Sequence, residues 1–182
     1  MLGLALAFFV SVYYFVLAIF NFVIFTAYPW FLKKTPFVKN LAVAWLASVS
    51  FLAAGFITDI GINISTGLLT LAAVSFVAVV AREIIKDIED AQGDSLVGLR
   101  TLPLVIGRGK SAILAFAFLY AGCALLSVPF LLQLFSIAYL LGAVPAVLLC
   151  IYAAKLPAAK AQKVIKIAMY LVFLGFVLGA VF

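Results

Sequence analysis

The sequence predicts an all-α protein, a polytopic bundle of about six to seven transmembrane helices. Hydrophobic residues make up 69% of the 182 residues and charged residues only 10%, whereas an ordinary globular domain carries about 25% charged residues. A soluble domain of this size cannot hide so much apolar surface and still present a polar exterior. Since one crossing needs about 20 apolar residues, the chain has room for six or seven of them.

Six apolar stretches follow one another, separated by short connections that hold most of the charges. The first is long for one crossing and contains Ser11 and Asn21, so we expect the end of one helix and a complete second helix there. Pro129 and Pro145 lie in or beside the fourth and fifth stretches. A membrane helix can accommodate such a proline as a kink, so neither divides its stretch. Residues 1–182 then form a single transmembrane domain. The stretches run over about 2–27, 41–57, 68–90, 111–130, 134–154 and 164–182.

The basic residues lie in alternate connections. Three follow the first stretch, five lie around the end of the third, four follow the fifth, and the connections between hold none of the 12. Because Lys and Arg are enriched on the cytoplasmic side of membranes, the sequence predicts an integral protein of the cell membrane whose basic, active face is cytoplasmic. Membrane lipid headgroups account for this charge, and nothing indicates a nucleic-acid partner.

The composition also excludes several kinds of chemistry. Histidine is absent, which rules out a Ser-His-Asp triad, a Cys-His dyad and an imidazole-bound metal. The two cysteines, Cys123 and Cys150, lie within apolar stretches. We expect both to be small packed hydrophobes rather than members of a disulfide framework or a CxxC metal site.

Five of the six acidic residues lie close together in one segment. On a helix, Glu83, Asp87, Asp90 and Asp94 fall within about 60° of one another, although the helix is expected to end near Gly93. Such a row of like charges is self-repelling and persists most readily beneath a cation. Carboxylate oxygens without imidazole or thiolate favour Mg²⁺. The alternative is a solvated helix end whose acids and bases pair locally.

The segment after this acidic row is rich in Gly, Pro and hydroxyl residues over 95–110. This composition predicts a loop, or a short interfacial helix with turns. Arg100 and Thr101 could donate hydrogen bonds to an anion there. The spacing does not match a phosphate-binding P-loop.

The acidic segment resembles the second aspartate-rich motif of the UbiA superfamily of intramembrane prenyltransferases. It reads Arg-Glu-Ile-Ile-Lys-Asp-Ile-Glu-Asp-Ala-Gln-Gly-Asp over 82–94, and Leu-Arg-Thr-Leu-Pro over 99–103 and Gly107 follow. The segment 28–40, Tyr-Pro-Trp-Phe-Leu-Lys-Lys-Thr-Pro-Phe-Val-Lys-Asn, resembles the basic segment after that family's fourth helix. The likeness is greatest to the archaeal branch and covers essentially the whole chain, as the later part of a nine-helix fold.

The resemblance implies transfer of a polyprenyl group, here geranylgeranyl, from its diphosphate to a lipid acceptor such as geranylgeranylglyceryl phosphate, in phospholipid biosynthesis. Aromatic acceptors use the same scaffold. The resemblance also implies Mg²⁺ as cofactor, with Asp87, Asp90 and Asp94 as catalytic and metal-binding residues. The diphosphate-binding residues that it implies are Lys33, Lys34, Arg82, Lys86 and Arg100.

One departure from the family matters. The family's first acidic motif has no counterpart here, since the only acidic residue outside 83–94 is Asp59, which is expected on the opposite face. The chain also begins within an apolar stretch. We therefore expect an incomplete UbiA-like domain that lacks its first helices, which a separate chain could supply. Two alternatives stay open: an inactive fragment or partner subunit that binds isoprenoid lipid without catalysis, and a small cation transporter.

Overall fold

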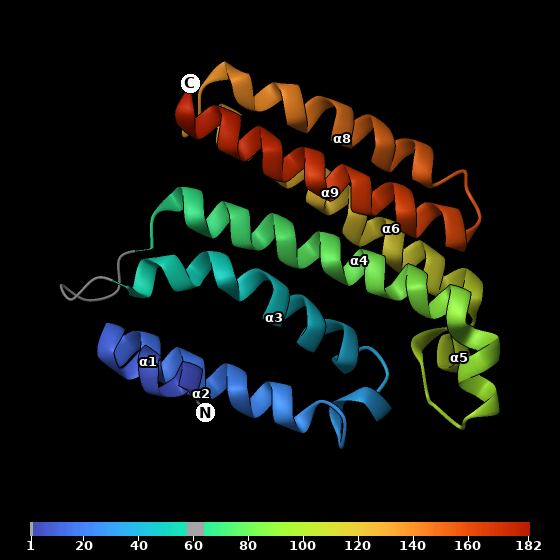
Figure 1. Ribbon diagram of the computed structural model, residues 1–182. Coiled ribbons are helices and arrows are strands. Elements are labelled where there is room, and N and C mark those ends of the chain that lie inside the picture. Colours follow the sequence, from blue (N-terminus) through green and yellow to red (C-terminus); the bar gives the residue numbers. More distant parts are fainter. Residues whose placement is uncertain (1, 58–63) are drawn as a thin grey trace.

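The computed structural model describes residues 2–57 and 64–182, so Asp59 lies outside the described residues. Helices dominate this part of the chain and lie side by side along a common direction (Figure 1). The α-helices are α1 (Leu2–Val10), α2 (Val12–Ala27), α3 (Val38–Ala53), α4 (Thr66–Leu96), α5 (Leu102–Ile106), α6 (Arg108–Leu125), α7 (Val128–Leu131), α8 (Leu140–Ala153) and α9 (Ala158–Val181). Three short 3-10 helices, η1 (Leu32–Lys34), η2 (Ala54–Phe56) and η3 (Ile137–Tyr139), join them.

Among the described residues, four helical segments are long and apolar enough to cross a membrane. These are Val38–Phe56, Thr66–Leu96, Arg108–Leu131 and Ala158–Val181, and two shorter apolar helices, Val12–Ala27 and Ile137–Ala153, lie among them. The prediction of an all-α polytopic membrane bundle is confirmed. The protein is an integral membrane protein.

The first apolar stretch contains two helices, as expected, and Ser11 separates them. Its backbone is extended (φ −167°, ψ 156°), and its Oγ accepts a hydrogen bond from the Tyr14 backbone N–H, which caps α2. The same hydroxyl donates to the Phe56 carbonyl oxygen at 2.6 Å. The chain reverses here, so α1 lies against α2 (Figure 1) and Gly3 lines the same groove as Leu17.

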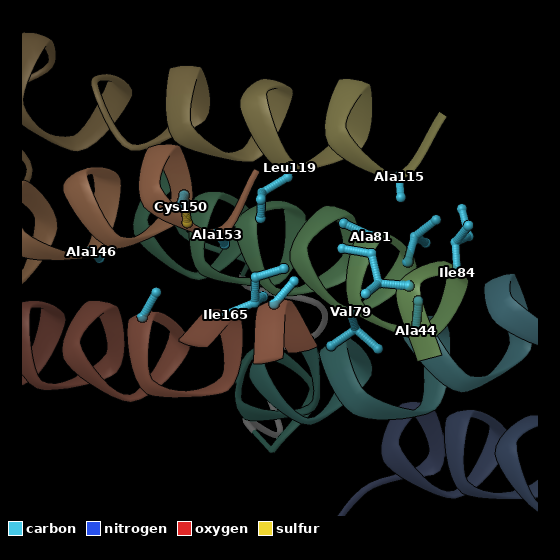
Figure 2. Packing of buried hydrophobic residues seen from close by; sticks show 14 of the residues in the cluster. Ala44, Val79, Ala81, Ile84, Ala115, Leu119, Ala146, Cys150, Ala153 and Ile165 are labelled. Atoms are coloured by element: carbon cyan, nitrogen blue, oxygen red, sulfur yellow. The ribbon is translucent and has the colours of Figure 1, made fainter. Parts of the chain in front are cut away.

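The helix α4 is the centre of the bundle and packs against α3, α6 and α9 (Figure 1). Alanine is frequent in the core that these helices share with α8, and small side chains let helix backbones approach closely within a membrane. Cys150 is buried in this core and Cys123 packs against it, both as free thiols. Figure 2 labels ten members of the core, Ala44, Val79, Ala81, Ile84, Ala115, Leu119, Ala146, Cys150, Ala153 and Ile165.

Glycines bring α8 and α9 into backbone contact. A Cβ atom added to Gly142 would lie 2.6 Å from the Cα of Gly175, and one added to Gly175 would lie 2.7 Å from the Tyr139 carbonyl oxygen. The Tyr139 hydroxyl donates to the Leu126 carbonyl oxygen at 2.9 Å, and its ring centroid lies 5.0 Å from that of Phe176. This end of the bundle is therefore tightly packed.

The three connections that contain basic residues lie at one end of the bundle (Figure 1). They follow α2, α4 and α8, whereas the C-terminus lies at the opposite end. The expected helix end near Gly93 was wrong, because α4 continues unbroken to Leu96. A glycine within a helix costs only about 1 kcal/mol, so Asp94 belongs to α4. The expected short helix in the following segment is α5.

Candidate functional site

Asp87 of α4 is the most enclosed carboxylate of the acidic row. Only 5% of its surface is exposed, and two residues from the first turn of α3 bind it. The Lys39 Nζ lies 2.7 Å from Asp87 Oδ1, and the Asn40 Nδ2 donates to Asp87 Oδ2 at 2.9 Å. An unpaired buried carboxylate would be very costly. Lys39 and Asn40 therefore supply the partners that this carboxylate needs and connect the start of α3 to α4.

Phe37 sets the entry into α3. Its backbone has φ 65° and ψ −43°, a left-handed conformation that a bulky residue rarely adopts. The ring packs beside that of Phe118 on α6, with 6.1 Å between centroids. A strained residue of this kind costs about 1–3 kcal/mol and needs surrounding structure to hold it. The anchored ring fixes where α3 begins, and hence where Lys39 and Asn40 meet α4.

Tyr28 and Glu83 extend the polar site around Asp87. Glu83 lies one helical turn before Asp87 on the same face of α4, and Arg82 Nη1 donates to its Oε1 at 2.9 Å. Burial raises the pKa of Tyr28, the neighbouring Lys39 lowers it, and Glu83 and Asp87 raise it further. Tyr28, at the end of α2, is thus within electrostatic reach of all three charges. We call Tyr28, Lys39, Asn40, Glu83 and Asp87 the polar cluster.

Apart from Arg82, the other predicted site residues have no ion-pair partner among the described residues. Asp94 is partly exposed on the last turns of α4. Arg82, by contrast, pairs with its sequence neighbour Glu83, and its buried Nε has no partner in the described part of the chain. Glu89 accepts a hydrogen bond from Gln162 of α9. The exposed residues of the predicted set are Lys33, Lys34, Lys86, Asp90 and Arg100.

The oxygen donors of this region suit a hard cation such as Mg²⁺. Asp94 lies on the face of α4 that begins at Asp87, since seven residues return to within about 20°, and Asp90 lies about 60° from it. The Asn40 Oδ1, a carbonyl oxygen beside Asp87, is buried without a partner among the described residues. The donor chemistry therefore fits Mg²⁺. Within residues 2–57 and 64–182, however, no three acidic or thiol side chains come together as a ready ligand set.

A partly open apolar cavity of about 290 Å³ lies between α4, α6, α8 and α9, but it does not serve this site. Its lining on α4 includes Leu71, Val74 and Ala78. Ala78 and Asp87 are nine residues apart, which places them about 180° apart around the helix. The cavity therefore lies on the far side of α4 from the polar cluster.

A second hollow does lead toward the polar cluster. It is an open groove of about 410 Å³ between α1, α2 and α3. Its α3 wall includes Leu46 and Ala53, seven and fourteen residues after Lys39, so all three share one face of that helix. Its α2 wall includes Asn21, seven residues before Tyr28. The groove thus follows the helix faces whose ends hold the cluster.

Sequence reasoning missed three members of the polar cluster. Tyr28, Lys39 and Asn40 all lie in the segment 28–40, from which only Lys33 and Lys34 were singled out as site residues. An amide and an ammonium at the start of an apolar helix were a usable signal, because polar groups at membrane depth are costly and tend to mark sites.

Fold and site together define a polytopic membrane protein with a charged cluster at one end of the bundle and an apolar groove along the helix faces that hold it. The chain belongs to the UbiA prenyltransferase family, whose sequence profile matches residues 1–179.

The comparisons with individual relatives agree with this assignment. The digeranylgeranylglyceryl phosphate synthase of Methanobrevibacter smithii is 35% identical over 170 residues, which cover 90% of this chain and 60% of the relative. The synthase of Methanococcoides burtonii is 34% identical, over 98% of this chain and 64% of the relative. A solved structure of digeranylgeranylglyceryl phosphate synthase superposes with a TM-score of 0.87 at 31% identity, covering 99% of this chain and 66% of that one. The chain thus spans less than two thirds of the length of these relatives.

Proposed function

We propose that this protein acts in the Mg²⁺-dependent transfer of a geranylgeranyl group from its diphosphate to geranylgeranylglyceryl phosphate, in membrane phospholipid biosynthesis. The observation that carries the proposal is Asp87, a buried carboxylate that pairs with Lys39 and Asn40 at the basic end of the bundle. The names of the relatives, all digeranylgeranylglyceryl phosphate synthases, support the choice of acceptor. The basic end is the cytoplasmic face of the cell membrane in this proposal, following the placement of Lys and Arg.

In the proposed reaction, the bond between the allylic carbon and the diphosphate oxygen breaks, and the electron pair leaves with the diphosphate. The acceptor hydroxyl oxygen bonds to that carbon and releases its proton to a base. Lys33, Lys34, Lys86 and Arg100 lie at the end of the bundle where positive charge stabilises the leaving diphosphate. The groove binds the prenyl chain and keeps water from the carbocation.

Asp87, Asp90 and Asp94 are the residues that would hold Mg²⁺, with the Asn40 carbonyl oxygen beside them. An ionised carboxylate offers about four acceptor positions, and Lys39 and Asn40 occupy two on Asp87. When bound, the metal supplies further positive charge against the leaving group. Removal of divalent cations is therefore expected to abolish transfer.

A further helical partner belongs to the same proposal. None of the described residues of α2 is buried, and large apolar side chains such as Phe20 and Phe25 are exposed on it. The relatives are longer than this chain. We propose that additional helices pack on α1 and α2 and bring a second set of acidic residues, either from a separate chain or from further polypeptide.

The test is transfer in liposomes that contain the chain, alone and with the N-terminal helices of the M. smithii relative. Geranylgeranyl diphosphate, geranylgeranylglyceryl phosphate and Mg²⁺ are supplied, and the ether lipid and the released diphosphate are quantified. We expect Asp87→Asn and Asp90→Asn to abolish both products, and Lys155→Gln, an exposed lysine at the same end, to change neither. Metal-dependent transfer that survives both aspartate changes would overturn the assignment.

The same assay separates the two alternatives. Binding of the prenyl diphosphate without any diphosphate release, even with the added helices, would identify a lipid-binding protein. Cation flux into the liposomes that depends on Asp87 would identify a transporter. The position of the acidic row at one end of α4, rather than near its middle, disfavours the transporter.

A further inference from the structure

We propose that Cys123, Cys150 and Met169 form a binding site for a soft monovalent metal ion, of the class of Cu⁺ and Ag⁺. The site lies in the apolar cavity between α4, α6, α8 and α9. It goes beyond the proposed function and shares no residue with the polar cluster, so each can fail without the other.

The sulfur-containing side chains of this protein gather at one place. The chain has two cysteines and two methionines, and all of them except Met1 line this cavity of about 290 Å³. Cys123 comes from α6, Cys150 from α8 and Met169 from α9. Three helices therefore bring together sulfur ligands that no spacing motif in the sequence indicates.

The two thiols lie close to each other. The Cys123 and Cys150 side chains are within hydrogen-bonding reach across the contact of α6 and α8, and both are free thiols. Cys150 is buried in the core shown in Figure 2, whereas Cys123 and Met169 pack against that core and are partly buried. The cavity that they line is partly open, which leaves a route for an ion.

The lining of the cavity favours a soft ion over a hard one. Thiolate and thioether sulfur favour Cu⁺, whereas Mg²⁺ and Ca²⁺ favour oxygen, and none of the described residues that line the cavity is acidic. The chain also has no histidine to complete a Zn²⁺ site. The polar cluster lies on the far side of α4, so the oxygen and the sulfur ligands are kept apart.

Charge balance favours a monovalent ion. An unpaired charge in an apolar cavity is costly, so binding has to leave the site neutral. When the ion binds, the S–H bond of one cysteine breaks, its proton leaves to water and a sulfur–metal bond forms, with no change in oxidation state. The second thiol and the Met169 thioether donate lone pairs and lose no proton. A divalent ion would leave a positive charge in the cavity unless both cysteines were ionised.

The test is a titration of the reduced, detergent-solubilised protein with Cu⁺ under exclusion of oxygen, in competition with a coloured Cu⁺ chelator. We expect a single ion to bind per chain, with release of a single proton. Cys123→Ser and Cys150→Ser should each weaken binding about a hundredfold or more, and Met169→Leu about tenfold, because each change removes one sulfur ligand. Ser75→Ala is the matched control, since Ser75 lines the same cavity without sulfur and should leave the affinity unchanged.

The opposite results are equally clear. If the unaltered protein takes up no Cu⁺ from the chelator, or if either cysteine variant binds within twofold of it, the thiols only pack and the proposal is wrong. An unchanged affinity in Met169→Leu would overturn the site of three sulfur ligands.

A second measurement addresses folding. Cys123→Ala with Cys150→Ala replaces both thiols with the small residue that is frequent in the same core, and its melting temperature without metal reports whether it folds. Ag⁺ should raise the melting temperature of the unaltered protein, because a ligand that binds the folded state stabilises it, and should not raise that of the double variant. An equal rise in both proteins would contradict the proposal.

Discussion

Lys39 and Asp87 are 48 residues apart in the sequence and meet at 2.7 Å across the interface of α3 and α4. The lysine begins one membrane helix and the aspartate lies in the charged end of another. Their contact, with Asn40 on the second carboxylate oxygen, joins Asp87 of the acidic row to the end of the segment 28–40. The two segments that resemble family motifs thus touch in the folded protein.

Removing the charge of Asp87 should destabilise the protein, because the mostly buried Lys39 would lose its counter-ion. We expect Asp87→Asn to reduce the free energy of unfolding by about 3 kcal/mol, as for a broken buried ion pair. Thermal unfolding in detergent, followed by tryptophan fluorescence, measures the change. The matched control is Asp90→Asn, an exposed residue three positions later on the same helix, which should change stability by less than about 0.5 kcal/mol. Equal shifts in the two variants would contradict the structure.

Gly142 should tolerate no side chain. An added methyl group meets the backbone of α9 at Leu171 and Gly175, and backbone atoms cannot move aside as a flexible side chain can. We expect Gly142→Ala to cost about 3 kcal/mol, the upper end of overpacking penalties.

Gly93→Ala is the matched control for Gly142→Ala, because the added Cβ meets nothing within 4 Å. It should leave stability unchanged or raise it by up to about 1 kcal/mol, since alanine is the better helix former. Melting temperatures of the two variants, measured side by side, test the pair, and a harmless Gly142→Ala would show that α8 and α9 lie further apart.

Asn21 should contribute to the attachment of α2. Its Oδ1 accepts a hydrogen bond from the Trp45 Nε1 at 2.9 Å, and none of the described residues of α2 is buried. We expect Asn21→Leu to cost about 1 kcal/mol, the usual size of a hydrogen bond between membrane helices, and to increase exposure of Trp45 to a lipid-soluble quencher. Thr26→Val, on an exposed position of the same helix, should affect neither measurement.

Tyr28 should make stability depend on pH in the alkaline range. Burial is the largest cause of its raised pKa, so the folded protein holds the phenolic proton more tightly than the unfolded chain does. The resulting stabilisation is complete below the unfolded pKa of about 10 and is lost as pH rises through the folded pKa. Tyr28→Phe should flatten the fall in melting temperature above pH 10, and it should remove one late step from the absorbance titration of tyrosinate. An unchanged pH profile would contradict the burial of Tyr28.

Much of the architecture followed from composition and periodicity. The lack of charge over long stretches predicted the membrane bundle. The length of the first stretch, with Ser11 and Asn21 within it, predicted two helices there, as the structure has them. The extension of α4 to Leu96 was not predicted. Glycine and charged residues are typical of a helix end, and the sequence was interpreted in that way. Both kinds of residue can also occur inside a helix that continues beyond the membrane.

On its own, the sequence determined that this is a membrane bundle, where its charges cluster and which family it resembles, because these properties depend on residues close together in the chain. Only the tertiary structure decided that Lys39 and Asn40 are the partners of Asp87, and that the groove between α1, α2 and α3, rather than the cavity on the far side of α4, follows the helix faces that hold them. Contacts between helices depend on which faces pack together and on the backbone at Phe37. Neither is encoded in the periodicity of any single helix.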